Sequence, residues 1–152
     1  MFEFFYKWKS FYGAELFEHL KGWDDTIAGY NSADCLFPYL FLVTIGIAIV
    51  LFFLYYYVIN HPRFNRWWSW LIMFLLVAAG AFGYSYYVVH ASIVQNNIAP
   101  SLQYAISTSN GLLLGIYSAI MAILLFLLLT LLLRHWSSNC KHSPWKSILR
   151  KK

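Results

Sequence analysis

Residues 36–59 read LFPYLFLVTIGIAIVLFFLYYYVI and contain no charged side chain. In a helix that rises about 1.5 Å per residue, a run of this length reaches roughly 36 Å. The hydrocarbon core of a bilayer is about 30 Å thick, so the run is long enough to cross it with some tilt. We therefore predict a transmembrane helix over residues 36–59.

Two further runs, residues 67–90 and 111–133, have a similar length and also lack charged side chains. Between the first two runs, Pro62 stops a helix, and the short stretch 60–66 predicts a tight helical hairpin. The sequence therefore predicts an all-α integral membrane protein with three transmembrane helices.

The connection between the second and third runs, residues 91–110, is polar but uncharged. Pro100 favours a turn that is followed by a new helix. On that basis the second helix would run on to about Asn96, and the third would begin near Ser101.

The composition agrees with a membrane protein, because 61% of the residues are hydrophobic and only 11% are charged. In globular proteins about 45–50% of the residues are apolar and about 25% are charged. We divide the chain into an N-terminal segment (1–35), a transmembrane domain (36–133) and a basic cytoplasmic tail (134–152). All six acidic residues lie in the N-terminal segment, which excludes a carboxylate proton relay within the spans.

The N-terminal segment carries an apolar stripe at helical spacing. Lys9 and His19 interrupt this stripe. The aromatic content of the segment favours an amphipathic helix that lies in the membrane interface as an anchor. The alternatives are a plug over a pore and a docking helix for a partner. The stripe consists of Phe5, Trp8, Tyr12, Leu16, Leu20 and Trp23.

The cations predict the orientation of the chain. With three crossings, the hairpin and the C-terminal tail share one side, which holds eight Lys and Arg residues against three in the N-terminal segment. The positive-inside rule then places the C-terminus in the cytoplasm and the N-terminus outside, in a cytoplasmic (inner or plasma) membrane. We expect lipid headgroups rather than nucleic acid to contact these cations. The headgroup contacts predicted are Arg63, Arg66, Arg134, Lys141, Lys146 and Arg150.

Small residues mark two helix faces. On the third helix Ser107, Gly111, Gly115 and Ala119 follow one another at intervals of four residues, a pattern that lets helices approach closely. The partner could equally be a helix of the same chain or of another copy. On the second helix a strip of small and polar residues could line a pore, although helix packing is the favoured interpretation. The candidate pore-lining residues are Ala81, Ser85, Ser92 and Asn96.

No catalytic, cofactor or metal motif occurs in the sequence. The two cysteines, Cys35 and Cys140, are predicted to lie on opposite sides of the membrane and so to stay unpaired. His90 lies near the outer end of the second helix, where a pH-sensing histidine is less expected than one without a function. We therefore expect neither an enzymatic activity nor a bound cofactor. The favoured function is a self-associating membrane protein that forms or gates a passive pore; the alternative is a non-catalytic anchoring or accessory subunit of a larger membrane complex.

Overall fold

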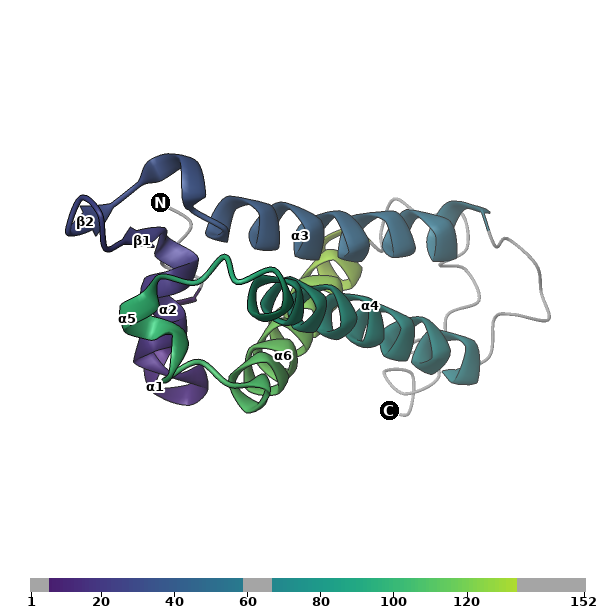
Figure 1. The fold of residues 1–152 in the computed structure, drawn as a ribbon. Helices are drawn as coiled ribbons and strands as arrows, with labels where there is room; N and C mark the ends of the chain where they lie inside the picture. Colours follow the sequence, from purple (N-terminus) through teal and green to yellow (C-terminus); the bar gives the residue numbers. More distant parts are fainter. Residues whose placement is uncertain (1–5, 59–66, 134–152) are drawn as a thin grey trace.

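Three long helices dominate the computed structural model, which describes residues 6–58 and 67–133 (Figure 1). They are α3 (Phe37–Phe53), α4 (Trp67–Val94) and α6 (Thr108–Leu133), and a π-helical turn, η3 (Leu54–Val58), extends α3. Each of the three is long and apolar enough to cross a membrane. The chain is therefore a mainly helical, multi-pass membrane protein, as the three uncharged runs predict.

The helix ends differ from the predicted ones mainly in the connection between α4 and α6. Helix α4 ends at Val94, close to the expected Asn96, which adopts a positive φ of 51°. The prediction that the third helix begins near Ser101 is wrong. Ser101 belongs instead to the separate helix α5 (Pro100–Gln103), and α6 starts only at Thr108.

Apolar side chains from all three long helices hold together the half of the bundle that contains the C-terminal part of α3. Ala48 and Phe52 of α3, Val77 of α4, and Ala122 and Phe126 of α6 are fully buried in one cluster. The most extensive packing in the described chain is between α4 and α6. The cluster contains no charged residue, as expected for helices that lie in lipid.

The N-terminal segment folds into small elements at one end of the bundle (Figure 1). These elements are α1 (Lys9–Tyr12), α2 (Ala14–Lys21), the antiparallel strands β1 (Trp23–Asp24) and β2 (Gly29–Tyr30), and the 3-10 turn η2 (Ser32–Asp34). Gly13, at a φ of +106°, separates α1 from α2. The amphipathic stretch is therefore not one continuous helix, and a two-stranded ladder follows it. We call residues 6–35 the cap.

The apolar stripe of the cap packs against the long helices. Tyr12, Leu16 and Leu20 are fully buried, in one cluster with Phe37 of α3 and Leu114 of α6. The break at Gly13 allows this packing, because it turns the stripe onto the ends of the long helices. Half of the stripe expected to touch the membrane interface thus lies in the protein core. The other three residues differ: Trp8 is 73% exposed, Trp23 is half-buried in β1, and Phe5 lies outside the described residues.

A cluster of aromatic rings fixes the start of the cap between α3 and α6. The Tyr12 hydroxyl donates a hydrogen bond to the backbone carbonyl of Tyr6. The Tyr6 ring stacks on Phe37, with 5.4 Å between the ring centroids, and lies 5.8 Å from the Tyr117 ring. Such aromatic contacts add to the stability gained by burial.

Candidate functional site

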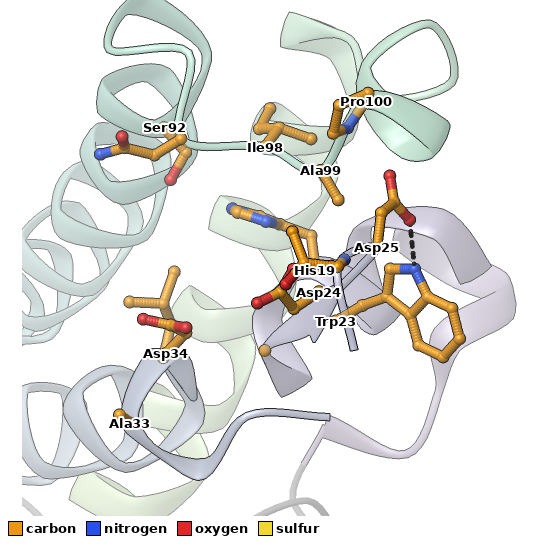
Figure 2. Close-up of a pocket in the computed structure, with 14 residues that line it drawn as sticks. His19, Trp23, Asp24, Asp25, Ala33, Asp34, Ser92, Ile98, Ala99 and Pro100 are labelled. Carbon is orange, nitrogen blue, oxygen red and sulfur yellow. Dashed lines mark hydrogen bonds between the residues drawn. The ribbon is translucent and has the colours of Figure 1, made fainter. Parts of the chain in front are cut away.

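A pocket of about 700 Å³ lies where the cap meets the α4–α5 connection (Figure 2). Four parts of the chain form its walls: the end of α2, the β1–β2 ladder with η2, the last turn of α4, and the loop that leads into α5. The volume lies in the range of about 300–1,000 Å³ that is usual for small-molecule sites. The lining residues are His19, Gly22, Trp23, Asp24, Asp25, Thr26, Ala33, Asp34, Leu36, Ser92, Asn97, Ile98, Ala99 and Pro100.

Backbone hydrogen bonds hold the cap walls of the pocket in place. Gly22 ends α2 in the left-handed conformation, and its carbonyl accepts a hydrogen bond of 2.8 Å from the Asn31 amide. The Leu36 amide donates to the Leu20 carbonyl at 2.9 Å. These two bonds tie the end of α2 to the segment that leads into α3, so His19 and Asp34 are held near the same cavity.

A long-range contact joins the cap to α5 beside the pocket. The Ser101 backbone amide donates to Asp25 Oδ2 at 2.9 Å, and the Ser101 hydroxyl donates to Asp25 Oδ1 at 2.6 Å. The indole of Trp23 also donates to Asp25 Oδ1, at 2.8 Å (Figure 2). The Ser101 side chain, then its backbone amide and then Trp23 lower the pKa of the Asp25 carboxyl, because these hydrogen bonds favour its charged form.

The other two carboxylates of the pocket each use one oxygen for local structure. Asp24 Oδ1 accepts bonds from the Thr26 amide and hydroxyl, and Asp34 Oδ2 accepts one from the Asn31 side-chain amide. Within the described residues, the second oxygen of each carboxylate accepts no hydrogen bond. Three Asp side chains and no Lys or Arg line the pocket, so its wall is strongly negative.

His19 lines the same pocket as these carboxylates and is the unusual member of the site. Its side chain is only 8% exposed, and its Nε2 atom has no hydrogen-bond partner among the described residues. A buried polar atom without a partner is costly, and each instance needs an explanation. Burial lowers the pKa of His19, because the charged imidazolium would lose its hydration. The ring is therefore neutral at pH 7.

The lowered pKa of His19 predicts an acid-sensitive fold. As the pH falls below about 6.5, His19 takes up a proton in the unfolded chain, whereas the folded chain takes it up only at a lower pH. The stability contributed by the neutral ring is thus present above that pH and is lost as the pH falls toward the lowered pKa. Thermal unfolding of the detergent-solubilised protein at pH 7.5 and pH 5.5 should show a larger loss for the parent than for His19→Gln. Equal losses in both proteins would contradict this origin.

Three of the four candidate pore-lining residues of α4 are buried in the structure. Ala81 and Ser85 are fully buried, and the Ser85 hydroxyl donates to the Ser118 hydroxyl of α6 at 2.7 Å. Ser92 is 8% exposed, and its hydroxyl donates to the Val88 carbonyl at 3.0 Å. Asn96 is exposed and accepts a bond from Gln103, so it lies outside the packed seam.

The small residues of α6 are partly used at the crossing with α4. A Cβ atom built on Gly111 would lie 3.1 Å from Val89, and one on Gly115 would lie 2.8 Å from Phe82. Ser107 directly precedes α6, is exposed, and donates to Asn110 in the first turn of that helix, and Ala119 is half-buried. The close approach predicted from the spacing therefore occurs within the chain at the two glycines.

The remaining predicted contacts fall on parts of the chain that the structure does not describe. All six proposed headgroup-binding cations (Arg63, Arg66, Arg134, Lys141, Lys146 and Arg150) lie in residues 59–66 and 134–152, as does Cys140. Cys35 is a free thiol. Among residues 6–58 and 67–133, no group of three or more His, Cys, Asp or Glu side chains is arranged to hold a metal ion.

Comparison with known proteins adds no further assignment, because no family model, curated protein or solved structure matches the chain.

Proposed function

We propose that the protein is a non-catalytic, non-conducting subunit that works by associating with other membrane helices. The observation that carries this proposal is the apolar character of the bundle surface at the depth of the membrane. A channel needs a path for water or ions through that depth, and the described residues of the three long helices offer polar groups mainly in their sealed interior.

The outward side chains of the long helices support this proposal. From Gly111 to Leu132 every exposed residue of α6 is Leu or Ile. On α4 the exposed residues from Ile72 to Gly83 are Ile, Leu, Ala and Gly, and on α3 those from Leu42 to Phe53 are aliphatic or aromatic. A pore formed between copies through these surfaces would have an apolar wall, which tends to expel water.

The lipid-facing side of α4 also has room for a neighbouring helix. A Cβ atom at Gly83 would meet nothing within 4 Å, and the exposed Ala79 lies one turn before it. Small residues at such positions allow close helix contacts, which drive association in a solvent that offers no hydrophobic effect. This feature favours an accessory subunit over an isolated monomer.

Reconstitution tests the proposal against the pore function that the sequence favours. We expect the purified protein to give no unitary currents in planar bilayers, at any voltage and at protein concentrations that produce dense incorporation. Vesicles of the same lipid without protein are the control. Sizing of the same preparation in nanodiscs separates a lone chain from a self-associated one. Discrete currents that scale with the amount of protein would overturn the proposal and support the pore.

A further inference from the structure

An apolar groove follows the surface of α6 where the start of the cap and α3 approach it. Two adjoining cavities form this groove and share Met121 and Leu124 in their walls. The first, of about 490 Å³, lies between α6 and the segment that includes α1. The second, of about 200 Å³, lies between α6 and α3. Neither the packing of the bundle nor the proposed function uses this groove.

The groove has the length of one leaflet of a bilayer. Its lining residues on α6 extend from Tyr117 to Leu128, which corresponds to a helical rise of about 16 Å. Helix α6 starts at the cap end of the bundle and runs away from it (Figure 1). The hydrocarbon core of a bilayer is about 30 Å thick, so one leaflet contributes about 15 Å. A single acyl chain whose headgroup lies at the cap end would therefore match the groove.

A cation and an exposed indole lie at the cap end of the groove. Lys7 and Trp8 line it there, and both are exposed. The preceding residue, Tyr6, stacks on Phe37 at the start of α3, which places this pair near the beginning of that span. Lys7 is the only charged side chain among the described residues that line the groove. A cation at this position attracts an anionic headgroup, and the Trp8 indole is a hydrogen-bond donor.

The same end of the groove disfavours a zwitterionic headgroup. Such a headgroup carries a cation beside its phosphate, and no Asp or Glu is among the described lining residues to pair with that cation. An anionic headgroup brings no second cation close to Lys7. Charge complementarity therefore favours a lipid with a net negative charge.

The width of the groove favours an acyl chain over a helix of another chain. A helix with its side chains is about 10–12 Å across, whereas the cavity between α3 and α6 measures only about 200 Å³. Met121 and Leu125 are half-buried, and Leu124 and Leu128 are more than half exposed. The groove is thus open on its outer side, so a lipid chain can enter it from the bilayer.

We propose that this groove is a binding site for an anionic phospholipid of the surrounding bilayer. The phosphate lies beside the Lys7 ammonium and accepts a hydrogen bond from the Trp8 indole. One acyl chain lies along α6 as far as Leu128, and the other stays in the bilayer. The groove does not include Gly83 of α4, which the proposed function offers to a neighbouring helix.

Photocrosslinking of the full chain in nanodiscs of phosphatidylcholine tests the proposal. The two probes are phosphatidylglycerol and phosphatidylcholine, each with a diazirine near the methyl end of one acyl chain, and peptide mass spectrometry locates the labelled residues. We expect the phosphatidylglycerol probe to label residues 121–128 about fivefold more than the phosphatidylcholine probe does, the factor that one cation near a membrane surface supplies. Equal labelling of these residues by the two probes would overturn the proposal.

A charge variant tests the headgroup contact. Lys7→Gln should lower the ratio of phosphatidylglycerol to phosphatidylcholine labelling at residues 121–128 by about fivefold. Lys21→Gln removes the same charge from the end of α2, outside the groove, and should leave the ratio unchanged. Labelling of the exposed residues between 72 and 76 on α4 reports lipid that merely surrounds the bundle, and neither variant should alter it. A Lys7→Gln protein with the ratio of the parent would overturn the proposal.

A second pair of variants tests the position of the acyl chain. Leu124→Trp fills the groove where its two cavities meet and should reduce the labelling ratio at residues 125–128 to about that of Lys7→Gln. Leu131→Trp places the same side chain at an exposed position of α6 outside the groove and should leave the ratio as in the parent. A parental ratio in Leu124→Trp would contradict a chain in the groove. None of these outcomes depends on the conductance that tests the proposed function.

Discussion

Valine in place of Gly22 should unfold the cap while the three long helices stay formed. Gly22 has a φ of +88°, which costs an L-residue roughly 1–2 kcal/mol, and a β-branched residue is among the worst suited to it. A Cβ atom there would also lie 2.4 Å from the backbone oxygen of Asn31. A backbone oxygen cannot rotate away, so we add a clash of about 1–3 kcal/mol.

Limited proteolysis and circular dichroism report this result. In the Gly22→Val protein we expect rapid cleavage within residues 6–35, with most of the helical circular dichroism signal retained. The matched control is Gly29→Val in strand β2. The nearest atom to a Cβ there is the Ile27 carbonyl oxygen at an ordinary 3.6 Å, and valine favours strands. A Gly22→Val cap as resistant as that of Gly29→Val would contradict the geometry at the end of α2.

The long helices could be predicted from the sequence because the decisive property is local. A run of uncharged residues such as 36–59 must leave water whatever the rest of the chain does, and its length sets its span. The small differences between the predicted and observed helix ends also have local causes. Helix α4 stops close to Asn96, which takes the left-handed conformation that asparagine tolerates.

The cap and its pocket could not be predicted in the same way, because contacts between distant residues create them. The spacing of Tyr12, Leu16 and Leu20 indicates a buried face, but the same spacing fits a face buried in lipid and a face buried in protein. The contact between Asp25 and Ser101 joins residues 76 positions apart. His19 breaks the apolar stripe, and this break was the available signal for a site: a histidine on a buried face needs a partner.

The two small-residue patterns show what spacing does and does not determine. Gly111 and Gly115 predict a close helix contact, and the structure has one, yet the pattern cannot choose between α4 and another chain. The hydroxyls of the α4 strip are compatible with either a pore or a packed contact between helices. In a packed contact, the buried Ser85 hydroxyl needs a hydrogen-bond partner on α6. Ser118 is that partner, and no periodicity within α4 reveals it.

The crossing of α4 and α6 therefore gives the second large effect, which we expect from Gly115→Leu. A Cβ atom at this position would lie 2.8 Å from Cδ2 of Phe82 and 3.2 Å from the Phe82 backbone oxygen. The Phe82 ring is half-buried and stacks on Tyr86, and its backbone carbonyl is fixed in α4. Overpacking of this kind costs about 1–3 kcal/mol, and leucine adds three carbon atoms beyond the Cβ. The free energy of unfolding in detergent should fall by about that amount.

Gly46→Leu is the matched control, because it makes the same substitution in a span where a Cβ atom would meet nothing within 4 Å. Both variants gain the same helix propensity, about 1 kcal/mol on scales measured in water, so the difference between them isolates the crossing. The size of the particle in nanodiscs adds a second measurement. A Gly115→Leu protein with the stability of the parent but a smaller assembly would show that Gly115 joins two chains, since a glycine that packs within one chain changes stability and leaves the assembly as it was.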